Sequence, residues 1–423
     1  MKPKKCTNGR QFMGWFFCGG CFSTFDCRDY KKVLGKVPQY YFLPIFLILS
    51  IHFLSVVADA AEITITPKLG VGGAYDDNVL FTTDDTVSTS IATVSPGVEV
   101  DYQTLLSSLS LSADFDILSY LDESDLDRTN QYYRLSGDHR IKERLTTSAN
   151  FKFFRDTTLN SYLQETGRAR DRLERDFFEA GGKVGYDITR INKITVGYRY
   201  QNVSYEGDAL SDYYNHRANL YFSHRLKNER DTLSVGPSYY YRSNDLNEVD
   251  SFSFDFGWDR DWSSITSSFA GIGALYSNVK SSNGIDEDDN FGAKARIDLN
   301  FRGTVSSTIF RYFHDLRTTA EGDDVNVDNF YLGYSRLLSE RFGFGINGRL
   351  VFSYKLFNQD ADINDERYFW LEPRLFYQIT EHLDLSLRYR YQNNVEFLSD
   401  GSDLSKDRNT IWLELSYGLP ILM

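Results

Sequence analysis

The feature that most constrains this chain is an alternation of apolar and polar residues that begins near Glu62 and recurs to the final residue, Met423. Between residues 383 and 391, every odd position holds Leu or Tyr, and the even positions hold Asp, Ser or Arg. A period of two places the two sets of side chains on opposite faces of a β-strand. We therefore expect an all-β protein whose strands each have one apolar and one hydrophilic face.

The number and length of the alternating segments predict a transmembrane barrel. We count about 18 segments, within a range of about 16–18, and many have roughly 10 to 14 residues. Tilted strands of this length can cross a membrane, whereas strands in soluble propellers and sandwiches, the alternative, usually have about 5–6 residues. The last segment alternates to its end, as outer-membrane barrels do, although Met423 stands where an aromatic residue is usual.

The connections between segments alternate in length, which is typical of outer-membrane barrels with short periplasmic turns and long external loops. We therefore predict an antiparallel up-and-down barrel with both termini on the periplasmic side. Short connections are expected at residues 189–192, 227–230, 302–304 and 380–382, and long ones at residues 76–86, 157–175, 283–288, 318–327, 355–365 and 395–407.

The first 60 residues have a different character. An apolar run at 40–57 follows several lysines, and Ala58 and Ala60 supply the small residues that a signal peptidase reads. This pattern predicts an extended signal peptide over residues 1–60 and a single barrel domain over residues 61–423. An uncleaved signal anchor is the alternative, but the run is short for a membrane span. All four cysteines lie in this first segment.

The charge of the expected mature chain narrows the choice of partners. The whole chain has 46 Lys and Arg and 59 Asp and Glu, of which the first 60 residues hold eight and three, respectively, so residues 61–423 carry a formal −18. Such acidity argues against a nucleic-acid partner. The 29 Tyr and 32 Phe residues suit aromatic girdles at two membrane interfaces.

We predict no catalytic, cofactor-binding or metal-binding residues. His139 and His382 lie near expected short turns, and no serine hydrolase motif accompanies the histidines of the mature chain. The acidic run at 286–289 lacks the spaced ligands of a calcium loop and is interpreted as a solvated surface patch.

If the apolar residues at alternate positions of each strand face lipid, the residues at the positions between them line the lumen. A barrel of about 18 strands leaves an aqueous channel unless something fills it. A charged, aromatic lining suits a hydrophilic solute, but charges in any large barrel also pair across strands and hold water, and this generic role remains open for each residue. The candidate lining residues are Arg199, Arg217, Arg296, Arg311, Arg317, Arg349, Arg374, Arg388, Arg390, Asp255, Asp298, Asp315, Glu372, Tyr331, Trp370 and Trp412.

The connection at 157–175 is unusual because it is rich in arginine. Arg168, Arg170, Arg172 and Arg175 are interleaved with acidic residues. Folded inward, the loop would narrow the pore and place a basic ring on the path of an anionic solute. The alternative, which we favour from sequence, is a short solvated helix or an external loop.

The opening of the barrel resembles a bacterial family of β-barrel porins often encoded beside exopolysaccharide synthesis and export genes. The resemblance rests on the run at 67–71 and on a turn of the Tyr-Asp-Asn type, matched here at Tyr75, Asp77 and Asn78. It extends over the mature chain only in architecture. It implies an outer-membrane pore and an exit for a secreted polysaccharide, and it carries no catalytic residues.

These observations favour a monomeric outer-membrane barrel that guides a polysaccharide through a polar lumen, in contact with lipid and with a periplasmic export component. A general diffusion porin for small hydrophilic solutes is the second hypothesis. A structural or adhesive barrel that acts through acidic external loops is the third.

Overall fold

The computed structural model describes residues 61–168, 172–207, 209–281, 287–318, 324–355, 365–398 and 400–422. The chain divides into two units, Met1–Asp59 and Ala60–Met423, and the described residues belong to the second. The expected signal peptide, its cysteines and Met423 lie outside the described residues, so cleavage after residue 60 stays a prediction.

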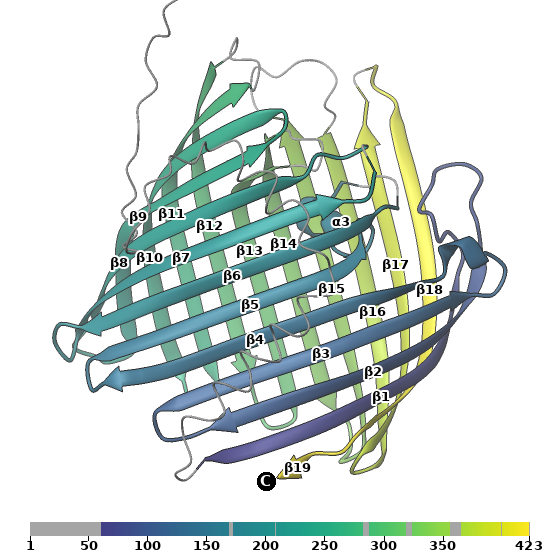
Figure 1. Ribbon diagram of the computed structural model, residues 1–423, viewed down its shortest axis with the longest axis horizontal. Coiled ribbons are helices and arrows are strands. Elements are labelled where there is room, and N and C mark those ends of the chain that lie inside the picture. Colours follow the sequence, from purple (N-terminus) through teal and green to yellow (C-terminus); the bar gives the residue numbers. More distant parts are fainter. Residues whose placement is uncertain are drawn as a thin grey trace, which may run out of the picture. The chain divides into compact units, whose positions relative to one another are not determined.

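Eighteen long strands form one antiparallel sheet that closes into a barrel (Figure 1). Each strand pairs with the next along the chain, and β1 also pairs with β18, which confirms the predicted fold and strand number. A two-residue strand, β19 (Ile421–Leu422), extends the pairing with β1. The long strands are β1 (Glu62–Asp76), β2 (Thr89–Gln103), β3 (Ser107–Tyr120), β4 (Arg128–Lys142), β5 (Leu145–Thr157), β6 (Glu174–Asp187), β7 (Asn192–Tyr205), β8 (Tyr213–Arg225), β9 (Asp231–Asn244), β10 (Asn247–Ser263), β11 (Thr266–Ser281), β12 (Glu287–Arg302), β13 (Ser306–Thr318), β14 (Asp324–Leu337), β15 (Phe342–Lys355), β16 (Asp365–Thr380), β17 (Leu383–Phe397) and β18 (Asp403–Gly418).

Among the described residues, helical structure is limited to two short elements. A 3-10 turn, η2 (Ser124–Leu126), follows β3, and a five-residue helix, α3 (Tyr162–Thr166), lies between β5 and β6. In the described part of the chain, no helix is both long and apolar enough to span a membrane.

The outer surface of the barrel is apolar, as the alternation predicts. Leu387, Tyr389, Leu413 and Leu415 point outward with 39–53% of their surface exposed. A soluble protein seldom leaves so broad an apolar surface uncovered, and a lipid bilayer accepts a strand only where the sheet closes and pairs every backbone group. The barrel is therefore an outer-membrane structure whose apolar face contacts lipid.

The external connections are shorter than predicted in several places. Residues 398–402, rather than 395–407, connect β17 to β18, and β14 already begins at Asp324, within the connection predicted at 318–327. The strands extend further because polar side chains continue to pair across them, as Tyr391 does with Asp407 at 2.6 Å. Polar residues such as Asn393 and Asp407 occupy outward positions at this level, so the alternation fades before the strand ends.

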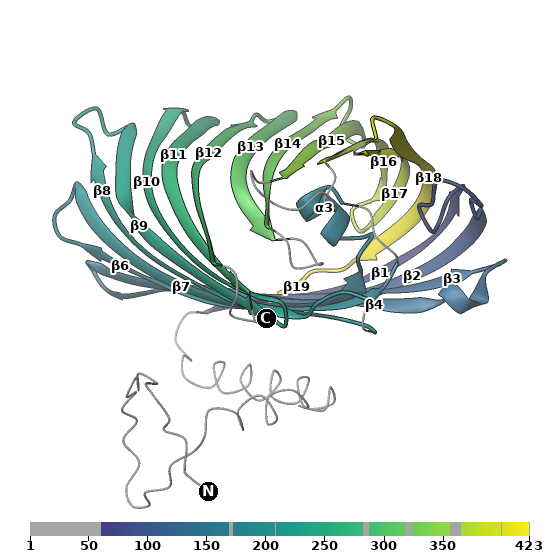
Figure 2. The same ribbon diagram turned by 90° about the horizontal axis from the view of Figure 1, so that it is seen from above.

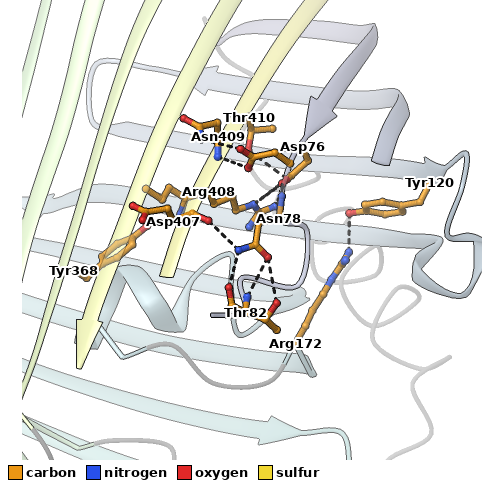
Figure 3. A network of polar contacts seen from close by, with 12 residues as sticks. Asp76, Asn78, Thr82, Tyr120, Arg172, Tyr368, Asp407, Arg408, Asn409 and Thr410 are labelled. Atoms are coloured by element: carbon orange, nitrogen blue, oxygen red, sulfur yellow. Dashed lines mark hydrogen bonds and ion pairs between the residues drawn. The ribbon is translucent and has the colours of Figure 1, made fainter. Parts of the chain in front are cut away.

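A polar cluster closes the barrel where the end of β1 meets β18 (Figure 3). The Arg408 guanidinium donates to both carboxylate oxygens of Asp76 at 2.5–3.0 Å, and the Asp76 side chain is only 1% exposed. Thr410 donates to the same carboxylate at 3.3 Å. The buried charges on β1 and β18 therefore satisfy each other at the seam between the first and last strands.

The Tyr-Asp-Asn turn found in the sequence continues this cluster. Asp77 accepts from the backbone and side chain of Asn409 at 2.7 and 2.8 Å. The Asn78 amide donates to the carbonyl oxygens of Thr82 and Asp407 at 2.8 and 2.9 Å. The turn thus ties the first external loop to β18, across the seam.

We predict that the substitution Asp76→Asn strongly destabilises the barrel. It leaves the Arg408 charge buried without its counter-ion, which typically costs about 3–5 kcal/mol. Urea unfolding of the protein in lipid vesicles measures the change.

Glu99→Gln on β2 is the matched control, since the Lys68–Glu99 pair is on the same wall but is largely exposed. Its loss should cost about 0–1 kcal/mol. Equal effects of the two substitutions would contradict a special role of the seam.

Candidate functional site

The candidate lining residues share one face of the sheet. The register places Asp298, Arg311, Tyr331, Arg349 and Trp370 at directly opposed positions on five consecutive strands, β12 to β16. All sixteen candidates have the parity opposite to the exposed apolar residues, so they lie on the inner face. Whether they guide a solute stays a prediction.

Many of these charges pair across strands, as the generic role requires. Arg390 contacts Glu372 at 2.5 Å and Arg388 contacts Glu414 at 2.9 Å across neighbouring strands, whereas Arg296 contacts Asp298 at 2.6 Å within β12. The guanidinium of Arg390 also lies over the rings of Trp370 and Trp412, 5.1 and 5.4 Å from their centroids. These cation–π contacts cover part of the aromatic surface that a sugar could use for stacking.

The connection between β5 and β6 spans residues 158–173, and its described part, which includes α3, enters the barrel. Figure 2 shows α3 inside the ring of strands. The helix ends at Gly167, whose φ of +77° is the left-handed conformation that commonly terminates helices and that glycine adopts without strain. We call residues 158–173 the inner loop.

The carbonyl groups at the end of α3 accept hydrogen bonds from the inner wall. Arg349 on β15 donates to the Gln164 oxygen at 2.9 Å, and Asn394 on β17 donates to the Gly167 oxygen at 2.8 Å. Ser353 on β15 donates to the Thr166 oxygen. The last carbonyls of a helix have no partner within the helix, so these wall residues satisfy them and fix the position of the inner loop.

Apolar contacts hold the inner loop against two opposite walls. Leu159 and Leu163 pack in a buried cluster with Val327, Val351 and other residues of β14–β16. Tyr162 packs in a second cluster with Phe177, Val203 and Tyr205 on β6 and β7. Because these strands lie seven to nine positions apart in a ring of eighteen, the inner loop bridges the lumen.

The first external loop also reaches this region. Phe81, between β1 and β2, is 2% exposed and belongs to the same buried cluster as Leu163. The polar cluster at the seam and the bridge across the lumen are therefore joined through one short segment, residues 77–88.

The arginines of the predicted basic ring have different environments. Arg168 and Arg175 are 2% and 1% exposed and contact Glu366 at 3.6 Å and Asp156 at 3.4 Å, respectively. Arg172 donates to the Tyr120 hydroxyl at 2.7 Å, and burial lowers the pKa of its guanidinium. Arg170 lies outside the described residues. Arg168 and Arg175 thus hold the loop in place and do not present their charge to the lumen.

The sequence pattern indicated Arg349 as a lining residue, but it missed the other polar residues that seat the inner loop. Ser353, Glu366 and Asn394 are polar residues of the inner parity and resemble the rest of the lining. A short helical run followed by Gly167 was the available signal, but the sequence does not reveal which wall receives the helix.

We predict that Gly167→Val displaces the inner loop. A Cβ atom at this position would lie 2.9 Å from a methyl carbon of Val351, in addition to the strain of a positive φ. Overpacking of this kind costs about 1–3 kcal/mol. Limited trypsin digestion should cleave the variant at the loop arginines much faster than the wild-type protein.

Gly207→Val is the control, because Gly207 has a φ of +79° and a Cβ there would meet nothing within 4 Å. It adds the same backbone strain without the clash. Rapid cleavage of the loop arginines in the Gly207 variant would show that the seat against Val351 is not responsible.

No family model matches this chain, and no curated protein matches it. Among solved structures, OccK2 of Pseudomonas aeruginosa is similar, with a TM-score of 0.45, 12% identity, and coverage of 86% of this chain and 99% of that chain. OccAB2 of Acinetobacter baumannii gives a TM-score of 0.43 at 10% identity, covering 86% and 98%. The ferric citrate transporter FecA gives 0.44 at 8% identity, covering 84% and 78%.

These similarities do not identify a solute. The closed strand pairing and the apolar outer face described above define the chain as an outer-membrane barrel. The chain is an 18-stranded outer-membrane β-barrel with one of its own external connections folded into its lumen.

Proposed function

We propose that this barrel is an outer-membrane channel for small hydrophilic solutes and that the inner loop is its constriction. The observation that carries the proposal is the bridge from β6–β7 to β14–β16, held by buried apolar contacts at both ends. A loop fixed in this way narrows the lumen without depending on a ligand. The charged inner face around it offers hydrogen-bond partners to a hydrated solute.

The wall between the two ends of the bridge supports the idea of a remaining passage. The inner positions of β9 to β11 include several small residues, among them Ser238, Ser251, Ser253 and Gly273. The inner positions of β14 to β16 hold Tyr331, Arg349 and Trp370. In this proposal the solute passes along the wall with small side chains, and the candidate lining residues Arg217, Asp255 and Asp315 face it there.

We predict that removing the inner loop increases the single-channel conductance. Thr157 and Glu174 are direct register partners at the ends of β5 and β6, so an Asn-Gly turn can replace residues 158–173 and still close the hairpin. Conductance in a planar bilayer is the measurement.

Replacing residues 398–402 between Phe397 and Asp403, also register partners, with Asn-Gly shortens a second external connection and should leave the conductance unchanged. If the shortened inner loop conducts no more than the wild-type protein, the constriction proposal fails. If neither the wild-type protein nor the variant without the inner loop forms channels, the channel proposal fails.

Export of exopolysaccharide through the same lumen, with a periplasmic partner, is the second candidate. The inner-face rings of Trp370 and Trp412 favour it, because the ring surface that Arg390 leaves uncovered suits stacking on sugars. A polymer chain would have to pass the bridge, so this function requires the inner loop to leave its seat.

We predict that a disulfide across the seat abolishes export if the barrel is a polysaccharide conduit. A Cβ at Gly167 would lie 3.1 Å from the Val351 Cβ, and a shift of a few tenths of an ångström brings the pair into the usual disulfide range of about 3.5–4.5 Å. In a gene-deletion strain, Gly167→Cys with Val351→Cys should fail to restore surface polysaccharide.

Each single cysteine variant is a control and should restore it, since neither can form the bond. Surface polysaccharide that is unchanged by deleting the gene would rule out the export function and leave the small-solute channel untouched.

A further inference from the structure

A small recess lies in the inner wall formed by β8 to β13, apart from the seat of the inner loop. Its free volume is about 30 Å³, which is room for one or two water-sized groups. Short serine side chains leave this space open between longer charged residues on either side. The lining includes Arg217, Ser238, Tyr240, Ser253, Lys294 and Asp315.

Arg217 has an unusual position. It is directly opposed across the strands to Arg199 on β7, and like charges at opposed positions repel. Arg199 has an acidic neighbour, with Glu179 at 3.9 Å. Within the described part of the chain, no carboxylate lies within 4.0 Å of the Arg217 guanidinium. The guanidinium carbon of Arg217 lies 5.3 Å from the centroid of the Tyr240 ring. An anion in the recess would relieve the repulsion.

Ser238 and Ser253 are oriented by one half-buried network of hydrogen bonds. Asp255 accepts from Tyr221 at 3.0 Å, from Ser238 at 3.2 Å and from Ser253 at 3.3 Å. Lys294 contacts Asp255 at 3.4 Å and donates to Ser253 at 3.2 Å. Ser238 and Ser253 also share a hydrogen bond at 2.6 Å. Their hydroxyl protons are thus used by Asp255 and by each other, which leaves the remaining serine lone pairs and one N–H of Lys294 for a ligand.

Asp315 supplies an acceptor on the β13 side of the recess. Its carboxylate accepts from the Leu316 backbone at 3.0 Å, and among the described residues no cation lies within 4.0 Å of it. A carboxylate with free lone pairs accepts readily from hydroxyl groups. The recess therefore combines a cation without an acidic partner with several acceptors for hydroxyl protons.

We propose that this recess is a binding subsite for a sugar acid. The carboxylate of the ligand occupies the recess and contacts Arg217 and the free N–H of Lys294, and its ring hydroxyls donate to Asp315 and to the serine oxygens. A neutral sugar leaves Arg217 without a counter-ion, and a simple carboxylate leaves the acceptors unused. The subsite rests on the proposed channel, because it names the class of solute that the lumen would bind.

Calorimetric titration of the detergent-solubilised protein with D-galacturonate tests the subsite. We expect saturable binding that is much weaker for D-galactose, which lacks the carboxylate, and for acetate, which lacks the hydroxyls. Arg217→Gln should weaken galacturonate binding about 10- to 100-fold, the usual effect of losing a hydrogen-bonded ion pair. Arg217→Lys, which keeps the charge, should weaken it less.

Arg374→Gln is the matched control. Arg374 is also an inner-face arginine opposed to a second arginine, Arg388, and it also lies over an aromatic ring, that of Phe376 at 5.9 Å. It does not line the recess, so its loss should leave binding unchanged. Equal weakening by both substitutions would show that the net charge of the lumen, and not the recess, attracts the ligand.

The absence of saturable binding to the wild-type protein, or equal affinity for acetate and galacturonate, would also overturn the proposal. Titration in detergent does not require an open pore. Binding without conductance would therefore contradict the channel alone, and conductance without binding would contradict the subsite alone.

Discussion

The structure depends on one constraint, which is that a backbone N–H or C=O group cannot remain unpaired in hydrocarbon. An open sheet would present the edges of β1 and β18 to lipid, and the barrel avoids this by pairing them over nine residues from Lys68 to Asp76. Closure then determines the environment of every side chain. The outward-facing side chains contact lipid and must be apolar, and the inward-facing side chains are enclosed and can be charged.

Enclosure explains why the charges of the lumen differ so much in burial. Asp76 and Arg408 at the seam, and Arg168 and Glu366 beside α3, are largely withdrawn from water and are paired. Burying a charge is tolerated only when a partner and hydrogen bonds compensate for lost solvation. Arg217 differs from these residues because an aromatic ring is its described partner. Paired charges hold the architecture, and Arg217 remains available to a ligand.

The inner loop connects architecture with function. Its helix is too short to be stable alone, so its position comes from the wall that surrounds it. Arg349, Ser353 and Asn394 satisfy the carbonyl groups at its end, and apolar clusters fix it on both sides. The same contacts that narrow the lumen for a small solute would have to break for a polymer, so the stability of this seat separates the two candidate functions.

The alternation of residues such as Leu383 to Tyr391 determined the strands, their number, the lipid-facing side and the inner face, because a period of two is a property of the extended backbone itself. The sequence also marked the turn at Asp77 and Asn78 and the arginine-rich connection. Only the tertiary structure decided that this connection lies inside the barrel, that Arg168 and Arg175 are buried with acidic partners, and that serines on β9 and β10 border a recess with Arg217. These features join residues far apart in the chain, and their contacts depend on the curvature and register of the closed sheet, which no local pattern encodes.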